Sequence, residues 1–242
     1  MSNAAVIFAG GTGQRMNTRT VPKQFLELHG KPIIIYTLEA FERHEEIDGI
    51  IVVMIESWID HTRDLVRRYG LEKVKRIVPG GASGQESIYN GIKAAADVYG
   101  PDDIVLIHDG VRPLIDEETI TANIRSVEKY GTAITVTPAI ETITMKDETG
   151  AVGTIIDRSM CELARAPQSF RLGQILDVHE KARKEADGTS GFIDSASMMK
   201  HYGYKLYTVQ GKPENIKITT PSDYYIFRAM VDARENSQIF GL

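Results

Sequence analysis

The chain has 242 residues, of which 42% are hydrophobic and 25% charged, and its formal net charge is −5 at pH 7. These values describe a folded globular protein whose length suits one domain. The acidic balance argues against general binding to nucleic acids or anionic membranes, and no apolar run is long enough to predict a membrane span.

The single cysteine, Cys161, excludes an internal disulfide and fits a reducing compartment. The first residues, MSNAAVIFAGG, do not combine a charged region with a long apolar one, so we expect no secretory signal. Both observations favour a cytoplasmic protein.

Five apolar runs rich in β-branched residues are predicted to be buried strands: 4–9, 49–55, 75–79, 103–108 and 132–138. Amphipathic helical patterns lie between them, at 32–44, 57–70, 87–100 and 116–131. We expect Pro32 at the first helical position of its helix and Ser57 as an N-cap. This alternation predicts an α/β fold with a Rossmann-like, mostly parallel sheet flanked by helices.

Residues 139–160 interrupt the alternation, because they show no helical period and contain a turn signal, DETG, between two extended stretches. They are predicted to form a protruding β-hairpin. A lone two-stranded hairpin is marginal in water, so this segment should pack on something else, such as a second subunit. Helices near 172–186 and 194–202, a strand at 205–211 and a closing helix from Pro221 are expected to follow.

A glycine-rich loop, AGGTGQRM, follows the first predicted strand. The dinucleotide pattern G-x-G-x-x-G fails at its third glycine, where Met16 stands, and the P-loop pattern fails as well. Glycines let backbone N–H groups converge on anionic oxygens, and Arg15 and Lys23 follow closely. This combination favours a polyphosphate over a nicotinamide dinucleotide. A plain glycine turn without a ligand is the simpler alternative.

Two further loops lie at equivalent strand ends. The loop VPGGASGQES (78–87) is again rich in glycine and could surround a flat base. The segment IHDGVRPLI (107–115) places Asp109 beside Arg112, so Asp109 could hold a hydroxyl or a magnesium ion, or simply form an ion pair. Lys217, in ENIKITTPSD, has little specificity when taken alone.

Together these segments resemble a known family. AGGTGQRM, PKQF, HDGVRP, APQSF and NIKIT occur in the same order and spacing as in the cytidylyltransferases that make CDP-methylerythritol and CDP-ribitol. The resemblance covers about residues 4–230. It is closer to the ribitol-5-phosphate enzymes, because VPKQFLELHGKPIIIYT and DDIVLIHDGVRPLI are typical of that branch.

The resemblance implies a single nucleotidyltransferase domain over residues 1–242, with a dimerisation arm at about 139–160. The implied reaction transfers CMP from CTP to a polyol phosphate, D-ribitol 5-phosphate in the first place, and releases pyrophosphate. The implied cofactor is Mg²⁺ or another divalent cation, held mainly through the phosphates, with Asp109 as the candidate protein ligand. The implied assembly is a homodimer formed through the arm.

The resemblance also implies site residues. Those expected to neutralise the reacting phosphates are Arg15, Lys23 and Lys217. The nucleotide-binding set comprises Phe8, Ala9, Gly10, Gly11, Thr12, Gly13, Gly80, Gly81, Ala82, Ser87 and Gly110. The acceptor-binding set comprises Asp109, Arg112, Thr142, Arg158 and Thr219. Within this last set, Arg158 is expected to hold the acceptor phosphate.

Two positions depart from the family pattern. Gly84 stands where an arginine is usual, and Ile193 stands where a threonine usually touches the acceptor phosphate. Ile193 therefore suggests a different acceptor or a different way of holding it, unless it simply packs under the helix that follows. Three alternatives stay open: the methylerythritol-phosphate enzyme of isoprenoid synthesis, a catalytically impaired regulatory homologue and a nicotinamide oxidoreductase, which lacks the third glycine and the nearby acid of its pattern.

Overall fold

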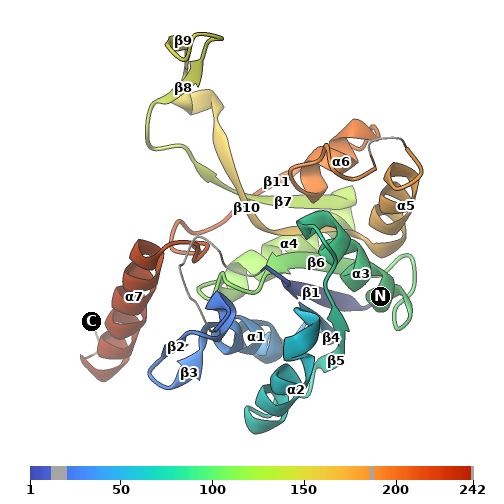
Figure 1. Ribbon diagram of the computed structural model, residues 1–242, viewed down its shortest axis with the longest axis vertical. Coiled ribbons are helices and arrows are strands. Elements are labelled where there is room, and N and C mark those ends of the chain that lie inside the picture. Colours follow the sequence, from blue (N-terminus) through green and yellow to red (C-terminus); the bar gives the residue numbers. More distant parts are fainter. Residues whose placement is uncertain (12–20, 186–187, 241–242) are drawn as a thin grey trace.

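The computed structural model describes residues 1–11, 21–185 and 188–240, and its centre is a seven-stranded sheet (Figure 1). The strand order is β11-β7-β10-β6-β1-β4-β5. The strands are β1 (Asn3–Ala9), β4 (Gly49–Met54), β5 (Val74–Pro79), β6 (Ile104–Asp109), β7 (Thr132–Pro138), β10 (Glu162–Arg171) and β11 (Thr208–Gln210). β10 runs antiparallel to both of its neighbours, and the other strands of this sheet share one direction. The Rossmann-like, mostly parallel sheet is therefore confirmed.

Helices cover both faces of the sheet (Figure 1). One face carries α1 (Ile33–Arg43), α2 (Ile59–Arg68) and α4 (Glu117–Tyr130), and the other carries α3 (Gly84–Ala96), α5 (Leu172–Ala182) and α6 (Ser195–His201). Alternation along β1 explains the two layers. Ala5 and Ile7 belong to the core of the first face, while Val6 between them belongs to the core of the second.

The last helix, α7 (Pro221–Phe240), packs outside these layers (Figure 1). Its Phe227 and Val231 contact the short hairpin β2 (Glu27–Leu28) and β3 (Lys31–Pro32) through a third apolar cluster that includes Leu28. α7 has 20 residues, but no helix in the described part of the chain combines the length and hydrophobicity needed to cross a bilayer.

Side-chain caps mark the starts of α3, α4 and α6, and the structure corrects three expected helix starts. Asp116 caps α4 by accepting a hydrogen bond from Thr119 N at 2.9 Å. α3 begins earlier than expected, because Ser83 is its N-cap and accepts from Glu86 N at 3.1 Å. Ser57 is not an N-cap, since it lies in a 3₁₀ turn that precedes α2. Pro32 is the N-cap residue of α1, one position before its first turn.

The sequence pattern does not predict β10, and it overestimates the length of β11. β10 contains Pro167, which removes a backbone donor and argues against an internal strand. The strand tolerates this proline because its register with β7 shifts between Ala164 and Gln168. β5 is only half buried because it forms an edge of the sheet.

The hairpin expected at 139–160 forms and stands away from the body of the molecule (Figure 1). β8 (Ile143–Lys146) and β9 (Val152–Ile156) pair in antiparallel fashion across a turn in which Gly150 has a φ of +88°. We call residues 139–160 the arm. Large hydrophobic side chains lie exposed along it: Ile140, Met145, Val152, Ile155 and Met160.

The order of the strands locates the place where a ligand can bind. β4 and β5 lie on one side of β1 and β6 lies on the other, so the chain changes direction across the sheet between β1 and β6. Open α/β sheets bind ligands beyond the carboxyl ends of the strands at such a point. Phe8 and Asp109 are register partners there.

Candidate active site

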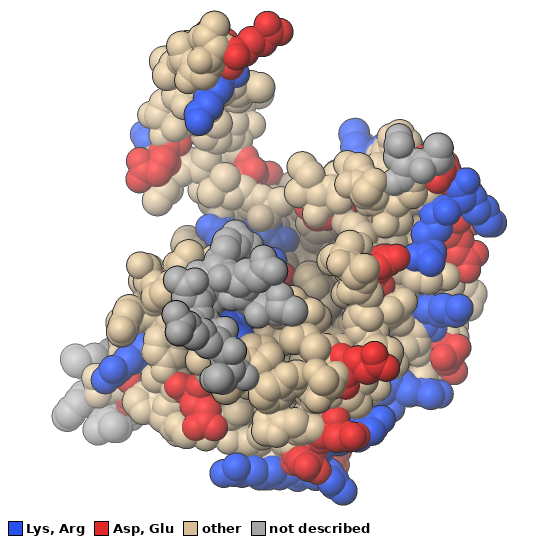
Figure 2. Space-filling view, viewed as in Figure 1, with Lys and Arg blue, Asp and Glu red and all other residues tan. Residues whose placement is uncertain are grey.

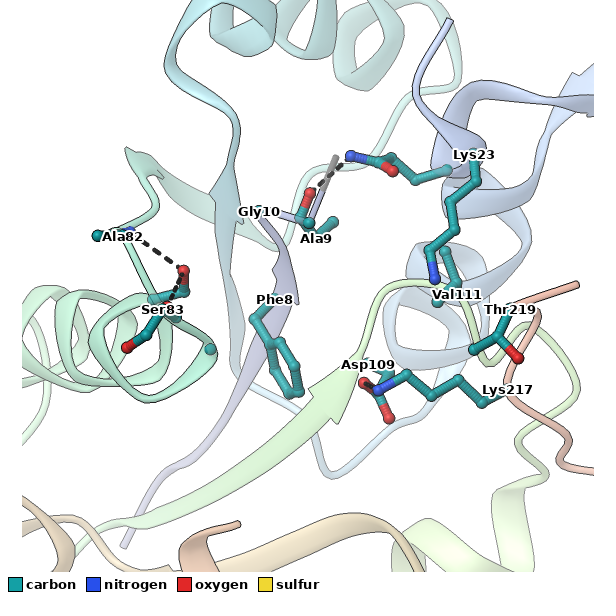
Figure 3. A pocket seen from close by; sticks show the side chains of 15 residues that line it. Phe8, Ala9, Gly10, Lys23, Ala82, Ser83, Asp109, Val111, Lys217 and Thr219 are labelled. Atoms are coloured by element: carbon teal, nitrogen blue, oxygen red, sulfur yellow. Dashed lines mark hydrogen bonds and ion pairs between the residues drawn. The ribbon is translucent and has the colours of Figure 1, made fainter. Parts of the chain in front are cut away.

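A cavity of about 550 Å³ opens at the carboxyl ends of β1 and β6 (Figure 3). Its volume is in the range of small-molecule sites. The lining comes from the loops after β1, β5 and β6 and from the segment before α7: Phe8, Ala9, Gly10, Gly11, Lys23, Gln24, Gly81, Ala82, Ser83, Gly84, Ser87, Asp109, Val111, Lys217 and Thr219. We call it the main cavity.

The glycine loops after β1 and β5 meet at very short range. A Cβ atom at Gly10 would lie 3.1 Å from Ser87 Oγ, and one at Gly80 would lie 3.0 Å from the same atom. Larger residues would push the two loops apart. Buried Gln24 fixes the first loop by donating from Nε2 to the carbonyl oxygen of Ala9 at 2.6 Å (Figure 3).

The second loop is held by its own helix. Ser87 Oγ donates to the carbonyl oxygen of Ser83 at 3.0 Å and accepts from Gly81 N at 3.1 Å. Glu86 Oε2 accepts from Ala82 N at 2.8 Å. The first turn of α3, with its free N–H groups, thus borders the main cavity at Ser83 and Gly84, and such a helix terminus favours anions.

Asp109 holds two cations at the floor of the main cavity. Lys217 Nζ lies 2.6 Å from Asp109 Oδ1 (Figure 3), and Arg112 Nε, which that view does not draw, donates to Oδ2 at 2.8 Å. Burial alone would raise the pKa of Asp109, but the charges of Lys217 and Arg112 hold it down at about 2. The carboxylate is therefore ionised at neutral pH and positions the ammonium group of Lys217.

Lys23 and Thr219 approach the main cavity from the side of α7 and the β2–β3 hairpin (Figure 3). Lys23 Nζ donates to the carbonyl oxygen of Ile218 at 3.1 Å. Thr219 donates from both N and Oγ1 to Asp223 Oδ2, each at 2.8 Å. The described lining therefore carries two lysines against one carboxylate, which suits an anionic ligand.

The described lining does not fit a magnesium site built by the protein alone. Mg²⁺ requires several oxygen ligands in octahedral geometry. Asp109 is the only carboxylate among the described lining residues, and its two oxygens face Lys217 and Arg112. A divalent cation would have to arrive on a ligand that brings its own oxygens.

A second cavity of about 260 Å³ adjoins the first and shares Phe8, Gly84, Asp109 and Lys217 with it. We call it the side cavity. It extends to Arg112, the start of α6 and the base of the arm. A Cβ atom at Gly84 would meet no atom of the described residues within 4 Å.

Ile193 lies on the rim of the side cavity and is 94% exposed. The expectation that it packs beneath the following helix is wrong.

Comparison with known proteins agrees with this geometry. Residues 3–233 match the model of the IspD family, described as 2-C-methyl-D-erythritol 4-phosphate cytidylyltransferase. The chain belongs to this family. The membership sets aside a nicotinamide oxidoreductase as the reason for the glycine loop.

Individual relatives refine the comparison. A ribitol-5-phosphate cytidylyltransferase of Vibrio parahaemolyticus is 51% identical over 99% of this chain and 100% of its own. A 2-C-methyl-D-erythritol 4-phosphate cytidylyltransferase of Clostridium botulinum is 39% identical over 91% of this chain and 93% of its own. The crystal structure of 4-diphosphocytidyl-2C-methyl-D-erythritol synthase from Anaerococcus prevotii superposes with a TM-score of 0.81 at 27% identity, covering 96% and 98% of the two chains.

Most residues suggested by the resemblance to this cytidylyltransferase family meet in the two cavities. Those that line the main cavity are Phe8, Ala9, Gly10, Gly11, Lys23, Gly81, Ala82, Ser87, Asp109, Lys217 and Thr219. Arg112 lines the side cavity. Gly80 and Gly110 lie just behind the lining, where a Cβ atom at Gly110 would be 2.9 Å from Ala9 Cβ. Thr12, Gly13 and Arg15 lie outside the described residues.

Two of the suggested acceptor-binding residues do not reach either cavity of their own chain. Thr142 and Arg158 lie exposed on the arm, and Arg158 Nη1 donates to the carbonyl oxygen of Ile140 at 2.7 Å. Nothing else in the described chain approaches the guanidinium group of Arg158 closely enough to hydrogen-bond.

The sequence analysis did not single out several residues that the structure places in the cavities, among them Gln24, Ser83, Gln85, Val111, Arg165 and Ser195. Ser83 carried a usable signal, because Ser83-x-x-Glu86 is the spacing of a helix capping box. Arg165 stands two residues before Pro167, in a segment without a periodic pattern, so only the fold reveals it.

Proposed function

We propose that the protein transfers CMP from CTP to D-ribitol 5-phosphate, giving CDP-ribitol and pyrophosphate. The observation that carries this proposal is the 51% identity, over nearly the full length of both chains, to a protein named for this reaction. The relative named for methylerythritol phosphate is more distant, at 39%. The lysine-lined main cavity and the adjoining side cavity give the nucleotide and the acceptor separate places.

In the proposed mechanism, the triphosphate occupies the main cavity and the polyol phosphate the side cavity. A phosphate oxygen of the acceptor attacks the α-phosphorus of CTP. The bond from that phosphorus to the bridging oxygen of the β-phosphate breaks, and pyrophosphate leaves. The attacking phosphate is largely ionised at neutral pH, so no general base and no covalent intermediate are required.

Catalysis then consists of positioning and charge neutralisation. Lys217 lies where the two cavities meet, and Asp109 holds its ammonium group in place. Lys23 adds a second positive charge on the same side of the main cavity, where its ammonium group donates to the carbonyl oxygen of Ile218 (Figure 3). The glycine loops provide backbone groups for the base and the phosphates, and Arg15 is proposed to join the two lysines.

We also propose that the reaction requires a divalent cation such as Mg²⁺, bound through the phosphates of CTP. When bound, the cation shares the charge that develops on the leaving pyrophosphate. Removing it with EDTA should reduce turnover to background, and added Mg²⁺ should restore it. Full activity in excess EDTA would contradict this dependence.

We propose that residues 1–242 form one nucleotidyltransferase domain that works as a homodimer joined through the arm. The exposed apolar side chains of the arm support this proposal, since each would contribute about 1.5–3 kcal/mol if buried. In such a dimer, Thr142 and Arg158 contact the acceptor in the side cavity of the partner. Figure 2 shows how far the arm stands from the body that carries its own cavities.

A pyrophosphate-release screen tests the reaction. It crosses CTP, ATP, GTP and UTP with D-ribitol 5-phosphate, 2-C-methyl-D-erythritol 4-phosphate and other alditol phosphates. We expect turnover with CTP and ribitol 5-phosphate to exceed every other pair. Preference for methylerythritol phosphate would favour the isoprenoid enzyme, and no turnover with any pair would favour a regulatory homologue.

A further inference from the structure

Arg165 is a cation of the side cavity without a counterion in the described chain. It lies on β10 at the base of the arm, is half buried and donates from Nε to Thr137 Oγ1 at 3.2 Å. Among the described residues, no carboxylate lies within ion-pair distance of its guanidinium group, as the described ion pairs involve other arginines. Burial, together with the like charge of Arg112, lowers its pKa.

The acidic side chains of the side cavity are already engaged. Asp109 is paired with Lys217 and Arg112. Asp194 caps α6 by accepting from Ser197 N at 2.8 Å, and it also accepts from Gln168 Nε2 at 2.7 Å. The side cavity therefore keeps an excess of positive charge that the protein itself does not balance, and partial burial of such a charge favours the binding of an anion.

Two buried polar atoms line the same cavity and have no hydrogen-bond partner among the residues that the structure describes. They are Gln85 Oε1 and Ser195 Oγ, on side chains that are 7% and 1% exposed. A buried polar atom without a partner is destabilising, so these atoms favour a ligand that supplies partners. Hydroxyl groups fit both, because a hydroxyl can donate to the amide oxygen and exchange a hydrogen bond with the serine.

Two other residues that line the side cavity offer no side-chain hydrogen-bond donor to an anion. Ile193 has no polar side-chain atom at the position where the family usually has a threonine, and Gly84 has no side chain where an arginine is usual. The acceptor phosphate must also lie next to Lys217, where the two cavities meet, because it is the nucleophile. Arg165 is the remaining cation of the side cavity without an acidic partner among the described residues.

We propose that Arg165 binds the phosphate of the acceptor within its own subunit and so selects phosphorylated polyols, while Gln85 and Ser195 bind the hydroxyl groups. This inference rests on the proposed transfer of CMP to a polyol phosphate. The planar guanidinium group forms two parallel hydrogen bonds to a phosphate, which gives orientation as well as charge. Arg165 acts from the chain that forms the cavity, in contrast to Arg158, which reaches a partner.

Steady-state kinetics of Arg165→Gln with CTP and D-ribitol 5-phosphate test the proposal. We expect the KM for ribitol 5-phosphate to rise about 10- to 100-fold, while the KM for CTP stays within about twofold. Arg165→Lys should recover part of the loss, because it keeps the charge but not the two-pronged geometry. Arg63→Gln, an exposed arginine on α2 that pairs with Asp60, is the matched control and should change neither constant.

Each of the following outcomes decides whether the role proposed for Arg165 holds. An unchanged acceptor KM in Arg165→Gln overturns the role of Arg165, even if the wild-type protein is fully active. A variant that sediments as a monomer also overturns it, because Arg165 would then act at the subunit interface. If Arg165→Gln does not fold, Arg165→Lys must itself raise the acceptor KM at least about threefold. A wild-type protein that fails with every acceptor instead refutes the proposed reaction, whatever the variants do.

Discussion

The main cavity and the arm carry residues for the same proposed reaction, but the chain supports them very differently. In the main cavity, Asp109 is buried and bound to two cations, and Gln24 and Ser87 fix the glycine loops. On the arm, Arg158 is exposed and, among the described residues, its guanidinium group bonds only to the backbone of the arm itself. One half of the proposed site is therefore organised within a single chain, while the other half needs an external surface to define its position.

This contrast explains why exposed hydrophobic side chains gather on the arm. The body buries its large apolar residues on both faces of the sheet, whereas Met145, Val152 and Ile155 remain exposed on the hairpin. A two-stranded hairpin alone cannot enclose a hydrophobic core. The following predictions test the division of labour between the two regions, beginning with the largest expected effect.

Charge removal in the main cavity should have the largest effect. Lys217→Ala or Lys23→Ala should reduce kcat by about 10²–10³, equivalent to about 2.7–4 kcal/mol, as for the loss of one preorganised group that stabilises the transition state. Initial rates of pyrophosphate release measure the effect. Lys181→Ala, which removes an exposed lysine on α5, is the matched control. Near-normal turnover in either cavity variant would contradict the catalytic role assigned to the lysine that it replaces.

Mixing two inactive variants should reveal whether the arm acts on its partner. We expect Arg158→Ala and Lys217→Ala to be nearly inactive as separate homodimers. After subunit exchange at equal concentrations, about a quarter of the wild-type rate should return, because half of the dimers are mixed and each mixed dimer contains one intact site.

The same mixing experiment can contradict the proposal that Arg158 acts on the partner subunit. If Arg158 served its own cavity, no intact site would form and the rate would stay near zero. Sedimentation of the wild-type protein provides the second readout, and a fully active monomer would show that the arm does not work across an interface.

Ile193→Thr should have a smaller effect, confined to acceptor binding. A hydrogen bond from the new hydroxyl to a charged phosphate should lower the KM for ribitol 5-phosphate about tenfold. The melting temperature should hardly change, because Ile193 is 94% exposed. Ile193→Val is the control for the change of shape. An unchanged KM would contradict the proposal that this position contacts the acceptor.

Two buried histidines should make the stability of the body depend on pH, while the arm contains no histidine. Burial lowers the pKa of His108 and that of His179 to about 4 in each case. Both are neutral in the folded protein at pH 6 but take up protons on unfolding. Their contribution to the free energy of unfolding is therefore complete above pH 6.5 and is lost as the pH decreases toward 4. The slope is about 1.4 kcal/mol per pH unit for each histidine.

Urea denaturation at pH 7 and at pH 5 measures this loss. His179→Leu removes one group that takes up a proton on unfolding. The difference in the free energy of unfolding between pH 7 and pH 5 should therefore shrink by about 1–2 kcal/mol. The substitution also removes two buried ring nitrogens that have no partner in the described chain. An unchanged difference would show that His179 does not take up a proton on unfolding.

Local rules account for the parts of the fold that sequence reasoning predicts well. Apolar runs at the length of a strand and capping residues such as Asp116 act over a few neighbouring positions, and β1, β4, β6 and β7 appear where they are expected. β10 escapes prediction because its proline looks like a strand breaker. Only the shift in its register with β7, between Ala164 and Gln168, makes the proline acceptable in a strand that lies between β6 and β7.

For the site, the sequence by itself determined which residue types were at hand: three glycine-containing loops at strand ends, Lys23, Asp109 and Lys217, in an order that resembles one family. The tertiary structure decided how they combine. It joins Lys217 to Asp109 across 108 positions of the chain, leaves Ile193 exposed and brings Arg165 into the side cavity without an acidic partner in the described chain. Such contacts depend on strand order and register, which bring distant segments together and are set by the packing of the whole sheet rather than by neighbours in sequence.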